Sequence, residues 1–299
     1  MVIYFQSSIP HATIGIVVAK SPPASAAARL FFSCMTVRLT MILNNWPAPL
    51  RSALFKLLGV HWAHQLLDEL AADKPTKQEL LERIFARNNF NIRVTGAEKI
   101  PSNRGCLFAS NHPHGLFDGL GAMWLGCKYG HDSRAIGRHF LSVFEPIADW
   151  FLLLKVDANR RGQASKQIVK EATRFLTNGG SLVVTPAGRV SVSRPLWTPA
   201  QDLPWKPGVV RFSHASQAPI VLVYLDINHS VLRQIGQRFH GVVRALLQVW
   251  AYRFGRSLRL HMHVLDVVYP GQLPEGTPQQ QTAWLQARFD ELAAKVASS

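Results

Sequence analysis

The chain of 299 residues has little cysteine, few acidic residues and no long apolar run. Cys34, Cys106 and Cys127 show neither paired nor metal-like spacing, which argues against a disulfide framework and favours a reducing compartment. No run of 18 or more apolar residues occurs, so a transmembrane helix is not strongly indicated. The Gly-x-Ser-x-Gly elbow and the glycine patterns of dinucleotide and P-loop sites are also absent. These absences make a serine hydrolase or a nucleotide-binding fold of those kinds a poor hypothesis.

Acidic residues are outnumbered, with 18 Asp and Glu against 33 Lys and Arg, a net charge of +15 and a pI near 10.3. Such a surplus favours an anionic partner, either nucleic acid or an anionic membrane. No zinc-finger spacing, heptad or RNA-binding aromatic signature appears, so no nucleic-acid partner is expected. Between Val231 and Arg256 arginines alternate with large apolar residues, including Phe239, Trp250 and Phe254. This pattern is typical of a membrane interface, and equally of a core-facing helix with a solvated basic side.

The first 46 residues are expected to be an extension, followed by a single domain over 47–299. The apolar stretches at 12–19 and 26–43 are short or interrupted by arginines, and no Lys or Arg precedes the first of them. A secretory signal is therefore not expected. Two hypotheses remain for this segment. It is either a membrane-dipping anchor or the product of a start assigned too early, with Met35 or Met41 as the true start.

Alternating strand and helix patterns predict an α/β fold with a mostly parallel central sheet, flanking helices and a helical N-terminal region. The strand patterns lie at 90–94, 105–109, 181–185, 219–228 and 258–268. Helical patterns lie at 50–72, 120–127 and 168–176 and from Pro278 onward. A further helix is predicted to begin after Thr76, which forms a capping box with Glu79.

Residues 110–119 read Ser-Asn-His-Pro-His-Gly-Leu-Phe-Asp-Gly and follow a predicted strand. Two imidazoles and a carboxylate therefore lie at a strand-to-helix turn, where scaffolds commonly display reactive groups. Three hypotheses follow from the spacing. Asn111 and His112 cap a helix in which Asp118 is solvated; or His112, His114 and Asp118 bind a metal; or one histidine is a general base oriented by the carboxylate. The metal site is the weakest, because no further ligand lies close in sequence.

Residues 111–119 resemble the first motif of the glycerolipid acyltransferases, which include 1-acylglycerol-3-phosphate acyltransferase, in a bacterial Asn-His-Pro-x-Gly-x-x-Asp-Gly form. That superfamily usually places four residues between the histidine and the aspartate. Here five lie between His112 and Asp118, and three between His114 and Asp118. We prefer His112 as the base and Asp118 as its orienter, with His114 as the second choice. Backbone N–H groups near Gly115 are expected to stabilise the oxyanion.

Further stretches resemble later motifs of the same family. Residues 182–189 end in Thr-Pro-Ala-Gly-Arg and resemble the third motif, although Ala187 replaces its usual glutamate. Residues 218–223 resemble the fourth motif, and residues 153–161 loosely resemble the second. Guanidinium groups bind phosphate in bidentate fashion, so the resemblance implies an acceptor or donor phosphate near these positions. The residues implied in substrate binding are Arg160, Arg161, Gly188 and Arg189, with solvated surface arginines an equal alternative for the first two.

The resemblance implies an O-acyltransferase that moves a fatty acyl group from acyl-CoA or acyl-carrier protein to the hydroxyl of a lysophospholipid or other glycerolipid. Such chemistry needs a general base but no metal and no bound cofactor. A peripheral position on the cytoplasmic face of the cell membrane is expected. The alternative is a non-catalytic lipid-binding or membrane-remodelling protein on the same fold, which the missing glutamate at Ala187 favours.

Overall fold

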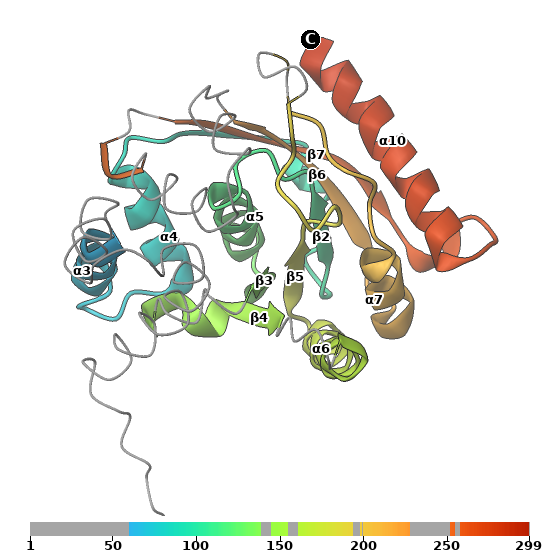
Figure 1. Ribbon diagram of the computed structural model, residues 1–299, viewed down its shortest axis with the longest axis horizontal. Helices are drawn as coiled ribbons and strands as arrows, with labels where there is room; N and C mark the ends of the chain where they lie inside the picture. Colours follow the sequence, from blue (N-terminus) through green and yellow to red (C-terminus); the bar gives the residue numbers. More distant parts are fainter. Residues whose placement is uncertain are drawn as a thin grey trace, which may run out of the picture.

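The structure, a computed structural model, describes residues 60–138, 145–154, 161–193, 198, 200–227, 252–254 and 258–298 (Figure 1). The expected N-terminal extension and most of the basic segment at 231–256 lie outside these ranges. The strands are β1 (Asn91–Thr95), β2 (Leu107–Ser110), β3 (Ser133–Arg138), β4 (Phe151–Leu154), β5 (Ser181–Val184), β6 (Ile220–Ile227) and β7 (Arg259–Val268). The α-helices are α3 (Val60–Leu70), α4 (Lys77–Ala86), α5 (Phe117–Lys128), α6 (Arg161–Thr177), α7 (Gly208–Ser216) and α10 (Pro278–Ser298). Short 3₁₀ helices are η1 (Ala97–Lys99), η3 (Glu145–Trp150) and η4 (Pro270–Gln272).

The strands form one seven-stranded sheet in the order β1-β7-β6-β2-β5-β3-β4. Five of its six pairings are parallel, and the pairing between β6 and β7 is antiparallel. The prediction of an α/β fold with a mostly parallel sheet is therefore confirmed. Strands β2, β5 and β6 lie at the centre, so the loops that follow β2 and β5 start side by side at the carboxyl edge of the sheet.

Helices cover both faces of the sheet, with α3, α4 and α5 on one side and α6, α7 and α10 on the other (Figure 1). Strand β2 shows why both faces are apolar. Phe108 packs into the core beneath α4 and α5, whereas Leu107 and Ala109 pack into the core beneath α6, α7 and α10. A strand that is buried on both faces has apolar residues at consecutive positions instead of at alternate ones. Residues Leu107 to Ala109 of β2 are apolar in this way.

The capping box predicted for α4 is present. The Glu79 N–H donates to Thr76 Oγ1 at 3.3 Å, and the Glu79 carboxylate accepts the Thr76 N–H at 2.7 Å. The helix then buries Leu80, Leu81 and Ile84, among others, against the core. Because these apolar residues repeat at helical spacing directly after the cap, both the start and the buried face of α4 followed from the sequence.

Strands β3 and β4 and helix α7 were not predicted. Strand β3 reads Ser-Arg-Ala-Ile-Gly-Arg, which lacks a run of β-branched or aromatic residues. Strand β3 forms because its main chain pairs in parallel with β4 and β5, and not because its own residues favour a strand. Of the helical pattern at 50–72, residues 60–70 form α3 and residues 50–59 lie outside the described ranges. In the part of the chain that is described, no helix combines the length and apolar character needed to cross a bilayer.

Candidate active site

The turn between β2 and α5 is attached to the sheet by Asn111. Its side-chain oxygen accepts the Leu225 N–H at 2.8 Å, and its side-chain N–H donates to the Leu225 carbonyl at 3.1 Å. The amide thus replaces a strand residue beside β6. Asn111 does not cap α5, whose first turn follows Leu116 without a side-chain cap. The capping hypothesis for this motif is therefore wrong, because the Asn111 amide is used to fix the start of the loop.

Asp118, the second residue of α5, lies under this turn with a side-chain exposure of 0%. Its carboxylate accepts the backbone N–H of His114 at 2.9 Å and that of Gly115 at 2.6 Å. These bonds satisfy N–H groups that would otherwise be unpaired at the start of the helix. The hypothesis of a solvated Asp118 is wrong. The Gly115 N–H is bound to Asp118, so stabilisation of an oxyanion stays a prediction for the other N–H groups near the start of α5.

His112 contacts the same carboxylate through its side chain. Its Nδ1 lies 2.8 Å from Asp118 Oδ2, and its side chain keeps 16% exposure. In the neutral ring with Nδ1–H donating to the carboxylate, the basic lone pair is on Nε2. A histidine held in this tautomer by a buried carboxylate is the arrangement that takes a proton from a hydroxyl.

Asp118 is ionised in this arrangement despite its burial. Burial acts to raise its pKa, but the hydrogen bond and charge of His112, the charge of His114 and the Gly115 N–H together lower the pKa below its usual value. A negative charge is therefore held next to Nδ1, where it stabilises the imidazolium that forms when His112 accepts a proton.

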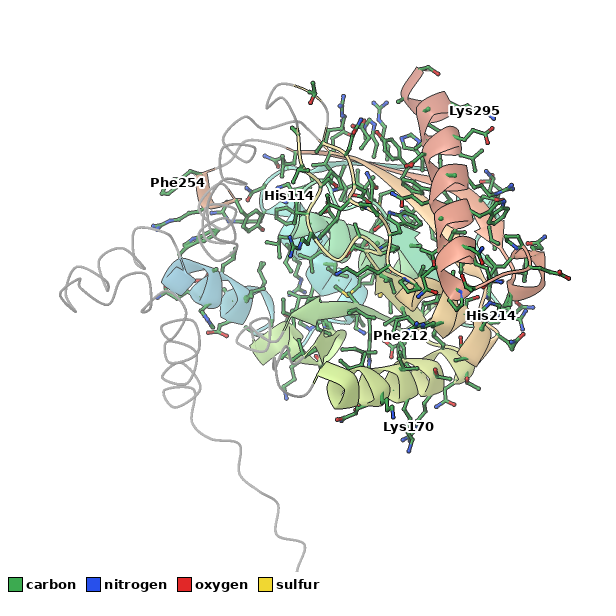
Figure 2. All side chains as sticks on the ribbon, turned by 45° about the vertical axis from the view of Figure 1, so that its right-hand side comes forward. His114, Lys170, Phe212, His214, Phe254 and Lys295 are labelled. Atoms are coloured by element: carbon green, nitrogen blue, oxygen red, sulfur yellow. The ribbon has the colours of Figure 1, made fainter. Side chains whose placement is uncertain are left out.

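His114 has a different environment. It is buried, and its ring packs against Phe117 with ring centroids 5.1 Å apart. Figure 2 shows His114 within the body of the molecule, whereas Lys170 and Lys295 point outward from α6 and α10. Of the two candidate bases, His112 combines partial exposure with direct contact to the carboxylate. Within the described ranges, no group of three or more His, Cys, Asp or Glu side chains is arranged to hold a metal ion.

Asp202 is a second carboxylate at the turn, partly buried, and sequence reasoning missed it. One oxygen accepts the His112 N–H at 3.1 Å and the Ser191 hydroxyl at 2.5 Å, and the other accepts Trp205 Nε1–H at 3.1 Å. Burial raises the pKa of Asp202, while the bonds from Ser191, His112 and Trp205 act in the opposite direction. Asp202 lies three residues from Trp205, so a bond between these two side chains is local in sequence. Its bond to His112 connects residues 90 positions apart, which no local pattern indicates.

The loop after β5 holds the residues of the third motif. The Gly188 N–H closes a turn on the Thr185 carbonyl at 2.9 Å, and Gly188 has a φ of +65°, a left-handed conformation that favours glycine. Ala187 is buried at 2% exposure, whereas Arg189 is exposed beside the turn. Of the other predicted arginines, Arg161 is the first residue of α6 and Arg160 lies outside the described residues.

The sequence of the chain is similar to those of known acyltransferases. A family described as acyltransferases matches residues 71–246, which include the turn with His112 and Asp118. The lyso-glycine lipid O-acyltransferase of Phocaeicola vulgatus is 26% identical over 153 residues, 51% of this chain and 53% of that protein. The chain thus spans about half the length of this curated relative. The crystal structure of the 1-acyl-sn-glycerophosphate acyltransferase from Thermotoga maritima has a TM-score of 0.49 and 15% identity, over 90% of this chain and 98% of that one. The resemblance expected from residues 111–119 is confirmed at the level of the family. Because the family match covers more than half of the sequence, this chain belongs to the acyltransferase family.

Proposed function

We propose that the protein transfers a fatty acyl group from a thioester donor to the hydroxyl of a lysolipid of the glycerolipid type. The observation that carries the proposal is the 2.8 Å contact between His112 Nδ1 and the buried Asp118. Support also comes from the relative in Phocaeicola vulgatus, which is named for O-acylation of a lyso-glycine lipid. Acyl-CoA or acyl-carrier protein is the proposed donor, as a co-substrate and not as a bound cofactor.

In the proposed reaction, His112 Nε2 removes the proton from the acceptor hydroxyl as its oxygen attacks the thioester carbonyl carbon. A tetrahedral oxyanion forms and then collapses with cleavage of the carbon–sulfur bond. The His112 imidazolium returns its proton to the leaving thiolate, so an ester and a free thiol are the products. General-base catalysis of this kind contributes about 10²- to 10⁴-fold to the rate. Asp118 stabilises the imidazolium without accepting its proton.

Purified protein, radiolabelled acyl-CoA or acyl-carrier protein and a panel of lysolipids test this function directly. The panel contains lysophosphatidic acid, other lysophospholipids and a lyso-glycine lipid. We expect a labelled ester with at least one acceptor and release of one thiol per ester formed. Absence of any labelled ester across the whole panel, with folded protein, contradicts the proposal.

Arg189 is the proposed contact to a substrate phosphate, next to the turn formed by Gly188. Arg189→Lys is expected to raise one KM about tenfold, because lysine cannot reproduce the planar fork and one charge-assisted hydrogen bond of about 1.5 kcal/mol is lost. Measuring KM separately for donor and acceptor identifies which phosphate is bound. Arg174→Lys, at an exposed site in the last turn of α6, is the matched control and should change neither KM. Unchanged kinetics in both variants would remove Arg189 from the site.

The proposed setting is an anionic membrane surface, bound peripherally on the cytoplasmic face. The charge of +15 supports it, and so does Phe254, which is 59% exposed and lies against the guanidinium group of Arg253. We expect cosedimentation with phosphatidylglycerol vesicles and little with phosphatidylcholine vesicles. In 1 M salt the Debye length falls to about 3 Å, so most but not all binding should be lost. Binding that is untouched by 1 M salt in the whole chain and vanishes without residues 1–46 would instead show that the N-terminal segment is an anchor.

A non-catalytic lipid-binding protein is the second candidate. Ala187, which is buried at the position of the usual glutamate of the third motif, favours it. A non-catalytic lipid-binding protein would retain lysolipid on a flotation gradient but would form no ester from a labelled donor. The labelled-ester assay above separates the two candidates, because only the enzyme consumes the donor.

A further inference from the structure

The main chain at His112 is held on both sides by residues far away in sequence. Its N–H donates to Asp202 Oδ1 at 3.1 Å, and its carbonyl accepts the Ser191 N–H at 2.8 Å. The Ser191 hydroxyl also donates to Asp202 Oδ1 at 2.5 Å. Three main-chain groups, one hydroxyl and one carboxylate thus form a connected set of bonds around the residue that carries the proposed base.

This set of bonds departs from the pairing of the sheet. Continuing the β2–β5 register beyond Ala109 and Val184 would bring His112 opposite Ala187. The His112 carbonyl bonds instead to Ser191, four residues later. The four extra residues are accommodated by the turn of the third motif, which leaves the line of the strand before Ser191. Ser191 and Asp202 therefore close the loop after β5 onto the loop after β2, at the carboxyl end of the sheet.

Asp202 itself is well suited to hold a neighbour in place. It is partly buried, and both of its oxygens are bonded, one to His112 and Ser191 and the other to Trp205. Trp205 is buried against Phe289 of α10, with ring centroids 5.0 Å apart. The carboxylate is thereby tied to the core, and the His112 N–H is tied to the carboxylate. Charge-assisted hydrogen bonds of this kind are about twice as strong as neutral ones.

We propose that Asp202 is a positioning residue for acyl transfer, which acts by holding the His112 main chain so that the ring stays between Asp118 and the acceptor hydroxyl. The role in transfer rests on the proposed function, whereas the role in placing the ring does not. Asp118 orients the ring, but it is attached to α5 and contacts His112 only through the side chain. If the His112 main chain were not held, any movement of the loop after β2 would also move the ring. A displacement of about 1 Å at a reacting group costs about 10²-fold in rate.

The test compares alanine and asparagine at position 202 in a Trp205→Phe background. Phenylalanine removes the Trp205 N–H, which would otherwise face the amide NH₂ of an asparagine. The amide oxygen introduced by Asp202→Asn would then remain free to accept the bonds from His112 and Ser191, and alanine would accept neither. Trp205→Phe alone is the matched control, because it removes one bond to Asp202 and leaves the His112 bond in place.

Kinetics provide the first measurement. We expect kcat of Trp205→Phe within about threefold of wild type. Adding Asp202→Ala should lower kcat by about 10²-fold with KM for donor and acceptor within about threefold. Adding Asp202→Asn instead should restore kcat to within about tenfold of wild type. Equal kcat in the alanine and asparagine proteins would overturn the proposal.

Proton NMR of the His112 ring provides the second measurement, which does not need turnover. A proton shared between a histidine Nδ1 and a buried carboxylate resonates downfield of the backbone amides, and its absence in His112→Ala assigns it. We expect this signal in Trp205→Phe and in its Asp202→Asn derivative, and its loss in the Asp202→Ala derivative. An unchanged signal in the alanine protein overturns the proposal even if no acceptor is ever turned over. If that protein does not fold, Ser191→Ala decides: the proposal expects kcat about three- to tenfold lower with the downfield signal shifted, and wild-type values for both overturn it.

Discussion

Replacing His112 by alanine is expected to lower acyl transfer by at least about 10²-fold while the protein remains folded. The ring supplies the base, and loss of general-base catalysis costs about 10²- to 10⁴-fold. The side chain is partly exposed and its contact to Asp118 is the principal one, so the fold depends on it little. The rate of ester formation at saturating donor and acceptor, together with the melting temperature, measures both parts of this prediction.

His114→Ala is the comparison that identifies the base. The His114 ring packs against Phe117 in the core, so this variant is expected to lose stability more than chemistry. If His112→Ala retains the wild-type rate and His114→Ala abolishes transfer at full folding, the choice of base is wrong. If neither variant affects transfer in folded, active protein, the catalytic interpretation of the turn is wrong.

Replacing Asp118 is expected to give the second large effect, on stability as well as on rate. Alanine leaves the His114 and Gly115 N–H groups without their buried acceptor, at about 1–3 kcal/mol for each unpaired group. It also removes the charge that stabilises the His112 imidazolium. We therefore expect Asp118→Ala to lower the free energy of unfolding by about 2–5 kcal/mol and acyl transfer by at least about 10²-fold.

Asp118→Asn separates these two effects. Its amide oxygen still accepts one or both backbone N–H groups, so most of the stability should remain. That oxygen, in the place of Asp118 Oδ2, would also face His112 Nδ1, but it carries no charge to stabilise the imidazolium. Urea unfolding and ester formation on the same samples should show a rate loss similar to that of alanine with a clearly smaller loss of stability. Equal losses of stability in the two variants would contradict the roles assigned to the backbone bonds.

The pH dependence of stability follows from the lowered pKa of Asp118. A carboxyl group whose pKa is lower in the folded than in the unfolded protein contributes stability above its unfolded pKa, near 4, and loses it as the pH falls through its folded pKa. The stability advantage of wild type over Asp118→Asn should therefore be complete at neutral pH and shrink from about pH 4 downward. An advantage that grows on acidification would show that Asp118 is not ionised in the folded protein.

The structure extends the site well beyond the motif. The bond from His112 to Asp202 and the bonds from Asn111 to Leu225 connect residues 90 and 114 positions apart. Leu225 belongs to a predicted strand, but Asp202 lies in no predicted motif or element, so no sequence pattern indicates which of the aspartates would contact the turn. These contacts depend on the order β6-β2-β5 at the centre of the sheet, which places the loops after β2 and β5 and the strand β6 side by side.

The sequence by itself determined the local features: the capped start of α4, the apolar character of β2 and the placement of His112 and Asp118 on one strand-to-helix turn. These followed because each depends on residues a few positions apart, whose propensities and spacing are visible in the chain. Only the tertiary structure decided that Asp118 is buried, that its acceptor sites are filled by backbone N–H groups, and that Asp202 holds the His112 main chain. Strands β3 and β4 belong to the same class, because their order comes from pairing with neighbours and not from their own sequence. The physical reason is that burial and long-range hydrogen bonds are set by strand order and loop paths, which no local pattern specifies.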